Sequence, residues 1–181
     1  TYCAEPPCGQ LNPASDLMYD VLGDVLAGVN AAFMDPLLHL GWDEVNEACW
    51  QADAGIRRYE AAHNLTFAGL LAEFFDRERA IVAALPRARR AVYWEEVVAS
   101  GLPLRAGDVV EMWSNRTLLE EALKIDGVDV IVAWADSYYA DCGAGNIFGA
   151  NSWCDPYKTW WTMYNTDPLA GVADPAAARP R

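Results

Sequence analysis

The sequence predicts an α/β fold assembled from parallel β/α units, and three observations support this prediction. The chain has 181 residues and is 53% hydrophobic, which is enough for one domain with a real core. Stretches with helical periodicity fall before and between short apolar runs. Turn residues bound these runs, as expected for buried strands, and there are four of them: Leu37–Gly41, Ala91–Val97, Val109–Trp113 and Val128–Trp134.

The first elements are a loop, a helix and a strand. Residues 1–13 are rich in Cys and Pro and predict a loop. Ser15 or Asp16 can cap the helix that follows, and the Asp35-Pro36 pair ends it. Its apolar residues recur at helical spacing: Met18, Val21, Leu22, Val25, Leu26, Val29 and Phe33. The run Leu37–Gly41 then predicts a buried strand.

Two further helical stretches separate the first strand from the second. One extends from about Asp53 to Ala62 and is interrupted near Asn64. The other extends from Phe67 to Leu85, and Pro86 closes it. The apolar face of this longer helix consists of Leu70, Leu71, Phe74, Phe75, Ile81 and Val82.

The remaining chain completes the strand, helix, strand pattern. A short helix at Leu118–Leu123 lies between the last two strands. Residues Ala140–Trp153 are rich in Gly and Asn and predict a loop, and a short aromatic segment with Trp160, Trp161 and Tyr164 follows. The final segment GVADPAAARPR is low in complexity and predicts a disordered tail.

Composition narrows the class of ligand. The formal net charge of −13 and the absence of a basic stripe disfavour nucleic acid. Eight tryptophans provide flat surfaces for a neutral ring such as a sugar. No window approaches 18 uninterrupted apolar residues, so no membrane span is predicted, and Thr1 does not open a signal peptide. Five cysteines and two glycosylation sequons, at Asn64 and Asn115, favour the secretory route.

Acids and aromatic residues gather where the predicted strands end, which is where parallel β/α folds carry their chemistry. Rings stack on indoles while carboxylates bind hydroxyls and transfer protons, so this pattern indicates a sugar site. The residues are Asp43 and Glu44 after the first strand, Trp94, Glu95 and Glu96 at the second, Trp113 at the third, and Tyr138, Tyr139 and Asp141 after the fourth.

Each of these residues also has a structural interpretation. Adjacent acids such as Asp43 and Glu44 are usually solvated surface, and the Glu95-Glu96 pair is typical of a solvated strand end. Trp94 and Trp113 alone would more often fill a core. His39, inside an apolar strand, is more often a core histidine than a ligand. No Cys/His spacing predicts a metal site and no glycine loop predicts a phosphate site, so no cofactor or metal is expected.

A resemblance to a known family favours the sugar site. The stretch HLGWDEVNEACW, residues 39–50, resembles the signature of family-20 glycoside hydrolases, whose usual form is His-x-Gly-Gly-Asp-Glu-Val followed by Cys-Trp. Residues 5–13 and 138–168 resemble the arthropod, chitin-degrading branch of the β-N-acetylhexosaminidases. The similarity covers nearly the whole chain up to Pro168.

The resemblance implies a partial (β/α)8 TIM barrel, with the strands corresponding to the fourth through seventh of the family's catalytic domain. Residues 1–168 would be the partial barrel, 169–181 a disordered tail, and the chain an incomplete copy. The implied function is a retaining exo-β-N-acetylhexosaminidase that releases terminal N-acetylglucosamine from chitooligosaccharides or glycans. The implied location is extracellular or lysosomal, and the full-length form could be a homodimer.

The resemblance also implies catalytic roles, because the family uses substrate assistance. The 2-acetamido oxygen of the sugar attacks C1 and forms an oxazolinium intermediate, so no protein nucleophile is needed. Glu44 would be the general acid and then the base that activates water. Asp43 would bind the acetamido N–H and stabilise the developing positive charge. Tyr139 would donate its hydroxyl to the acetamido oxygen.

Binding roles follow from the same mapping. Trp94 and Trp113 would be walls of the acetamido pocket, and Asp141 would bind hydroxyls of the non-reducing sugar. Trp153 would be a platform for the next sugar outwards. The resemblance further implies local disulfides between Cys3 and Cys8 and between Cys142 and Cys154, with Cys49 pairing to a cysteine upstream of Thr1.

Trp42 departs from the pattern, because the family has glycine there. An indole beside the catalytic pair is expected to crowd the sugar pocket or to force a different backbone path, so Trp42→Gly is expected to raise hydrolysis. An alternative function is therefore a non-catalytic relative that binds chitin saccharides and is inactivated by truncation and Trp42. Another is a conventional two-carboxylate glycosidase that pairs Glu44 with Glu95 or Glu96.

Overall fold

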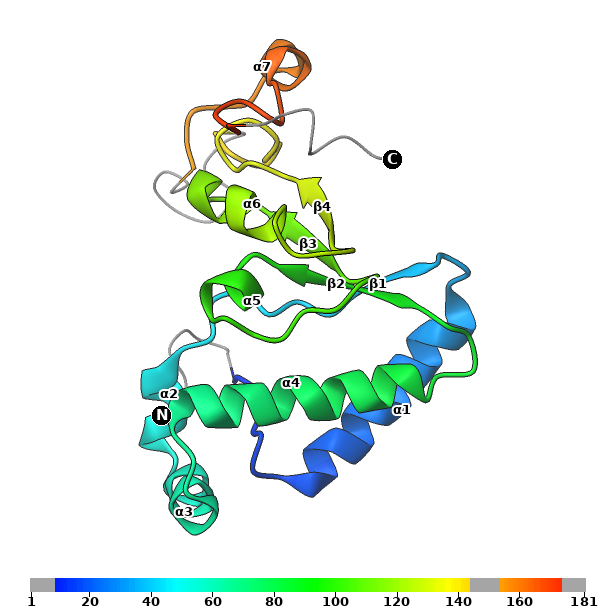
Figure 1. Cartoon of the computed structure of the whole chain (residues 1–181), viewed down its shortest axis with the longest axis vertical. Coiled ribbons are helices and arrows are strands. Elements are labelled where there is room, and N and C mark those ends of the chain that lie inside the picture. The colour runs from blue at the N-terminus through cyan, green and yellow to red at the C-terminus, as the bar shows by residue number, and fades with distance from the viewer. Residues whose placement is uncertain (1–8, 144–153, 174–181) are drawn as a thin grey trace. The chain divides into compact units, whose positions relative to one another are not determined.

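The computed structural model describes residues 9–143 and 154–173, which fall into two compact units (Figure 1). The N-terminal unit comprises residues 1–91 and the C-terminal unit residues 92–181. The boundary lies within strand β2 (Arg90–Trp94). Among the described residues, no helix has both the length and the apolar character needed to cross a bilayer.

Two long helices form most of the N-terminal unit, and both confirm predicted helices, although Val21 and Val25 of the first helix are exposed. Helix α1 (Asp16–Ala32) and helix α4 (Phe67–Ala83) pack against each other. An ion pair of 2.7 Å joins Arg77 to Asp16, and the Arg77 guanidinium lies 3.5 Å from the centre of the Tyr19 ring. A buried hydrophobic cluster of this unit consists of Leu26, Leu38 and Val82. The residues packed against it are Leu22, Val29, Leu40, Ile81 and Leu85.

Strand β1 (Leu37–His39) is shorter and more exposed than the sequence predicted. Only Leu38 is buried, because successive side chains of a strand point to opposite faces. The expectation of a fully buried strand was therefore wrong for Leu37. It was also wrong for His39, whose side chain is exposed and accepts a hydrogen bond of 3.0 Å at Nδ1 from the Gly41 amide.

Two short helices follow β1, and a side chain caps the start of each, Asn46 for the first and Asp53 for the second. Helix α2 (Glu47–Ala52) was not predicted, and the Asn46 side chain caps it by accepting from the Cys49 amide. Helix α3 (Ala54–His63) matches the prediction and ends at Asn64, which takes the left-handed conformation with φ 54°. Cys49 is buried in α2.

The C-terminal unit has the predicted parallel arrangement. Strand β2 pairs in parallel with β3 (Val109–Met112), and β3 with β4 (Asp129–Val132). Trp94 is in register with Glu111, and Met112 with Val132, so the carboxyl ends of the strands meet at one edge. The fully buried side chains of this unit include Tyr93, Val110, Met112 and Leu119.

Short helices connect these strands and follow them. Helix α5 (Glu96–Ala99), which was not predicted, follows β2, and helix α6 (Arg116–Ala122) lies between β3 and β4 as expected. Helix α7 (Trp160–Asn165) forms the aromatic segment, and its Trp160, Trp161 and Tyr164 are exposed. Residues 169–173 form turns, and the Ala173 amide donates to Glu120 at 3.0 Å. The remainder of the predicted tail lies outside the described residues.

Candidate active site

The loop after β1 presents the Asp43-Glu44 pair to solvent. Both side chains are exposed, and neither carboxylate has a hydrogen bond to the residues that the structure describes. The backbone here is unusual, since φ is 82° at Gly41, 83° at Trp42 and 51° at Glu44. A left-handed residue with a Cβ costs about 1 to 2 kcal/mol, so the loop needs compensating contacts.

Trp42 provides those contacts by burying its indole in the N-terminal unit, where only 8% of the residue is exposed. The ring centroid lies 5.1 Å from that of Phe74 in a tilted arrangement and 5.1 Å from that of Phe75 edge to face. The indole Nε1–H donates to Glu78 Oε2 at 2.6 Å. The backbone thus takes a left-handed path at Trp42, with the indole turned into this unit and the neighbouring carboxylates exposed.

Glu78 is the buried acceptor of this hydrogen bond, with 3% of the residue exposed. Burial raises the pKa of the Glu78 carboxyl to about 7, and the hydrogen bond from Trp42 lowers it in part. Nothing in the sequence indicated this partner, because 36 residues separate the two side chains and Glu78 reads as one of many polar helix positions.

A cavity of about 210 Å³ lies beside this pair. It is partly open and mostly apolar, and its oxygen-bearing side chains are those of Gln10, Asp43 and Glu78. The lining residues are Gln10, Leu11, Leu40, Trp42, Asp43, Val45, Trp50, Phe74 and Glu78.

The C-terminal end of the loop after β1 is hydrogen-bonded to the side chain of Gln10. The side-chain Nε2 of Gln10 donates to the Asn46 carbonyl at 3.0 Å, and its Oε1 accepts from the Asn46 amide. Trp50 closes the same region, because its indole donates to the Leu11 carbonyl at 3.1 Å. The segment bearing Asp43 and Glu44 is therefore fixed at both ends within the N-terminal unit.

In the C-terminal unit, the structure brings Trp113 and Tyr139 together. Trp113 directly follows β3 and Tyr139 lies in the loop after β4; both are half-buried. Their rings are nearly parallel, at 12°, with centroids 6.5 Å apart. Trp94, also half-buried, ends β2 at the same edge of the parallel sheet. Three aromatic side chains that were predicted to bind sugar thus occur at the carboxyl ends of neighbouring strands.

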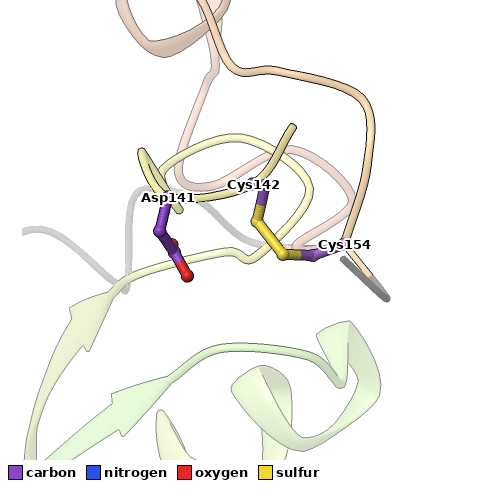
Figure 2. A group of neighbouring side chains, drawn as sticks. All are labelled: Asp141, Cys142 and Cys154. Carbon is purple, nitrogen blue, oxygen red and sulfur yellow. A yellow bond between two sulfur atoms is a disulfide. The ribbon is translucent and has the colours of Figure 1, made fainter. Parts of the chain in front are cut away.

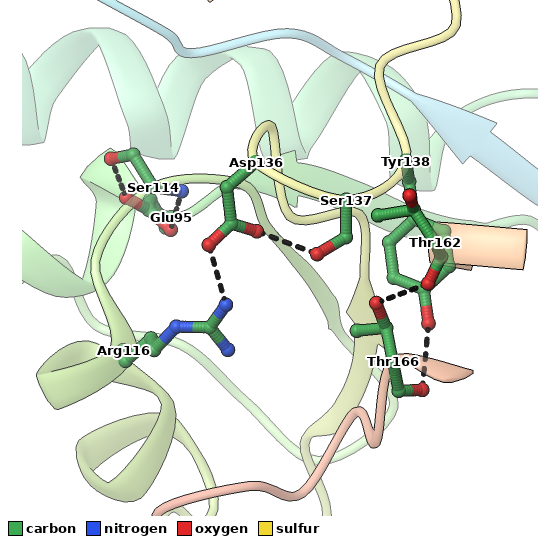
Figure 3. Close-up of polar contacts among 8 residues, drawn as sticks. All are labelled: Glu95, Ser114, Arg116, Asp136, Ser137, Tyr138, Thr162 and Thr166. Atoms are coloured by element: carbon green, nitrogen blue, oxygen red, sulfur yellow. Dashed lines mark hydrogen bonds and ion pairs between the residues drawn. The ribbon is translucent and has the colours of Figure 1, made fainter. Parts of the chain in front are cut away.

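Glu95 anchors the loop that carries Trp113. Only 3% of Glu95 is exposed, and its carboxylate accepts four hydrogen bonds. The donors are the amides of Trp113 (2.8 Å), Ser114 (3.2 Å) and Asn115 (2.9 Å) and the Ser114 hydroxyl (2.6 Å); Figure 3 draws the contact with Ser114. The interpretation of Glu95 as a solvated strand end was therefore wrong.

Glu96 orients the Trp113 ring itself. Its two carboxylate oxygens lie 3.1 and 3.3 Å from the indole Nε1 that donates to them. The Glu95-Glu96 pair thus secures both the backbone and the side chain of Trp113. These contacts weaken the hypothesis of a conventional two-carboxylate glycosidase, because the carboxylate of Glu95 is occupied by four donors.

Polar contacts also stabilise the loop after β4, which carries Tyr139 (Figure 3). Asp136 forms a 2.8 Å ion pair with Arg116 and accepts from the Ser137 hydroxyl at 2.8 Å. The Tyr138 hydroxyl donates to the Thr166 carbonyl at 3.4 Å. The Arg116 guanidinium also lies 4.6 Å from the centre of the buried Trp134 ring.

Asp141 is exposed beside the disulfide between Cys142 and Cys154 (Figure 2). This bridge is one of the two that the resemblance implied. Possible ligand atoms of these three residues lie within 4.8 Å of one another, but the sulfurs are bonded to each other and are not the thiolates that bind metals. Trp153, Cys3 and Cys8 lie outside the described residues.

Comparisons with known proteins identify a family. Residues 1–179 match the model of the glycosyl hydrolase family 20 catalytic domain. The chain is 30% identical over 201 residues to a probable β-hexosaminidase of Arthroderma benhamiae, covering 94% of this chain and 32% of the relative. It is 28% identical over 187 residues to the chitooligosaccharidolytic β-N-acetylglucosaminidase of Ostrinia furnacalis, covering 93% and 31%. The chain thus spans about a third of these relatives.

Solved structures agree on the fold. The Streptomyces coelicolor β-N-acetylhexosaminidase superimposes with a TM-score of 0.65 at 22% identity, covering 94% of this chain and 31% of that one. The exo-β-N-acetylglucosaminidase of Vibrio harveyi gives 0.65 at 23% identity, covering 91% and 26%. These enzymes are (β/α)8 barrels, so the predicted partial barrel is confirmed as the fold class.

Proposed function

Since the chain belongs to glycosyl hydrolase family 20, we propose that it carries part of the active site of a retaining exo-β-N-acetylhexosaminidase. The substrate class is chitooligosaccharides or glycans that end in N-acetylglucosamine. The observation that carries this proposal is the Asp43-Glu44 pair, which the left-handed loop after β1 exposes without tying either carboxylate to a described residue.

The two carboxylates divide the chemistry between them. The Glu44 carboxylic acid gives its proton to the glycosidic oxygen as the 2-acetamido oxygen of the sugar attacks C1 and the bond to the leaving group breaks. The Glu44 carboxylate then removes a proton from the water that opens the oxazolinium ring. Asp43 accepts the acetamido N–H and opposes the positive charge that develops on that group.

Aromatic residues of the C-terminal unit supply the acetamido pocket in this proposal. The parallel Trp113 and Tyr139 rings offer a flat wall and a hydroxyl donor for the acetamido oxygen. Trp94 is a second wall, Asp141 binds hydroxyls of the non-reducing sugar, and Trp153 stacks on the next sugar. Glu95 and Glu96 act through Trp113, whose backbone and indole they bind.

A secretory location is part of the same proposal. The asparagines of both sequons, Asn64 and Asn115, are exposed and accessible to glycosylation. The disulfide between Cys142 and Cys154 is a feature of proteins in oxidising compartments. An extracellular or lysosomal enzyme that acts on glycans fits these features.

The decisive experiment measures N-acetylglucosamine release from chitobiose by the longest gene product that contains this chain. Glu44→Gln should lower kcat by about 100- to 10,000-fold, because the amide cannot donate or accept the catalytic proton. Glu47→Gln is the matched control, since Glu47 is an exposed acid of α2 three residues away, and should retain wild-type kcat.

Two further outcomes distinguish the alternatives. Chitobiose that binds without being cleaved by the wild-type protein would support the non-catalytic saccharide binder. Equal cleavage of a substrate that lacks the 2-acetamido group would contradict substrate assistance, because such a sugar has no internal nucleophile.

A further inference from the structure

We propose that Trp42 and Glu78 are positioning residues: their buried hydrogen bond sets the direction in which the loop presents Asp43 and Glu44. This inference rests on the proposed function. It reverses the expectation drawn from the sequence, because the tryptophan at the signature's glycine position would then support catalysis rather than obstruct it.

The first step is the geometry of the loop. The Trp42 indole is buried while Asp43 and Glu44, its immediate neighbours in the chain, are exposed. The direction of a side chain follows from the backbone angles at its own residue. Fixing the Trp42 indole therefore fixes the peptide that leads into Asp43.

The second step is the backbone conformation. Trp42 and Glu44 both have left-handed φ angles, which residues with a Cβ avoid unless other contacts hold them. The contacts that hold Trp42 within the N-terminal unit include the rings of Phe74 and Phe75 and the acceptor oxygen of Glu78. Without them the loop would relax to negative φ and turn its carboxylates elsewhere.

The third step is the cavity. About 210 Å³ of space adjoins the indole, and Asp43 lines the same space. A ring that lost its hydrogen bond to Glu78 would have room to move there, and Asp43 would move with it. The hydrogen bond therefore adds a directional constraint on the ring to its packing against Phe74 and Phe75.

The charge of Glu78 should make the effect of its hydrogen bond depend on pH. Burial raises its pKa to about 7, and an ionised acceptor makes a stronger hydrogen bond than a neutral one. The titratable group that shares its cavity is Asp43. On α4 itself, the guanidinium groups of Arg77 and Arg79 lie over the rings of Tyr19 and Phe75. Ionisation of Glu78 should therefore strengthen its hydrogen bond to the Trp42 indole, even though the buried charge lowers the stability of the fold.

The test compares Trp42→Phe and Glu78→Leu with a matched control, Tyr19→Phe. Tyr19 is also a buried aromatic residue of this unit, packs against the Phe74 ring and donates to the Pro13 carbonyl at 3.2 Å, but it does not line the cavity or precede the carboxylates. In the longest gene product that contains the chain, the first two variants should lower kcat about tenfold, with KM changed less than twofold, because a small misplacement of catalytic groups costs rate. Tyr19→Phe should retain kcat.

Two readouts separate positioning from general stability. Hydrogen exchange of residues 41–46, measured on the 181-residue chain, should accelerate in Trp42→Phe and Glu78→Leu and stay unchanged in Tyr19→Phe. The ratio of wild-type kcat to that of Glu78→Gln should rise between pH 6 and pH 8, because the amide cannot become a charged acceptor. Glu78→Gln should also retain more activity than Glu78→Leu, since its amide oxygen still accepts from the indole.

The proposal is overturned if Trp42→Phe keeps wild-type kcat and wild-type exchange, or if Tyr19→Phe lowers kcat and accelerates exchange as much as Trp42→Phe does. The proposed function fails differently, through a Glu44→Gln variant that releases sugar at the wild-type rate. In that case hydrogen exchange alone still decides whether the Trp42–Glu78 pair orders the loop.

Discussion

Two loops of this chain rest on buried glutamates, but the glutamates hold them in different ways. Glu95 receives four hydrogen bonds from the loop after β3, three of them from consecutive backbone amides. Glu78 receives one, from the indole of Trp42 in the loop after β1. The loop held by Glu95 contains none of the left-handed residues, whereas the loop held by Glu78 contains three, Gly41, Trp42 and Glu44.

The number of hydrogen-bond donors determines how fully each buried glutamate is satisfied and how it holds its loop. Several amide donors satisfy a buried carboxylate and make its loop a rigid part of the fold. A single indole leaves the carboxyl of Glu78 with a pKa near 7, so its loop depends on protonation and on ring packing. The loop held by Glu95 carries Trp113, and the loop held by Glu78 carries the two acids of the proposed chemistry.

The largest expected effect is the loss of the Glu95 anchor. Glu95→Ala should lower the free energy of unfolding by about 3 to 4 kcal/mol, because three backbone amides and a hydroxyl lose their buried acceptor. Urea titration of the chain measures this change. Glu121→Ala, an exposed position on α6, is the control and should stay within about 0.5 kcal/mol. A loss in Glu95→Ala as small as that of the control would mean that water replaces the carboxylate.

The next effect is the pH dependence caused by Glu78. The pKa of Glu78 is about 7 in the folded chain against an ordinary value of 4.5. Below pH 4.5 Glu78 is therefore protonated in both the folded and the unfolded chain, and its full contribution to stability is present. Between pH 4.5 and 7 the unfolded chain loses the proton first, and stability falls by up to about 3 kcal/mol as pH rises. Above pH 7 the contribution is absent.

Urea midpoints at pH 5 and pH 8 measure this effect as a difference between variants. Glu78→Gln should remove the fall, because its amide does not titrate, while the exposed Glu47→Gln should retain the wild-type dependence. Identical pH profiles for wild type and Glu78→Gln would place the pKa of Glu78 near its ordinary value and remove the contrast with Glu95.

The smallest effect is the loss of one donor of the four. Ser114→Ala removes the 2.6 Å hydroxyl contact to Glu95 but leaves the three amide donors, so stability should fall by only about 1 kcal/mol. Urea titration beside Ser100→Ala, an exposed serine after α5, separates this loss from a general surface effect. A loss as large as that of Glu95→Ala would show that the hydroxyl, rather than the amides, supports the loop.

Local sequence patterns were enough to predict the long helices and the strands, but they did not predict the shortest helices. Helices α1 and α4 have 17 residues each, so their apolar periodicity repeats over several turns and Pro36 and Pro86 mark where they must have ended. Helices α2 and α5 have six and four residues, too few for a period to be visible. The strand containing His39 was predicted as buried because Leu37, Leu38 and Leu40 hid the alternation.

The amino-acid sequence by itself determined the parallel β/α pattern and, through the Asp43-Glu44 motif, which residues to examine as an acid pair. Both depend on residues close together in the chain. Only the tertiary structure decided that Trp42 turns inward to Glu78 and that Glu95 and Glu96 bind Trp113. Those contacts join residues 17 to 36 positions apart, and which buried donor meets which acceptor depends on how the elements pack.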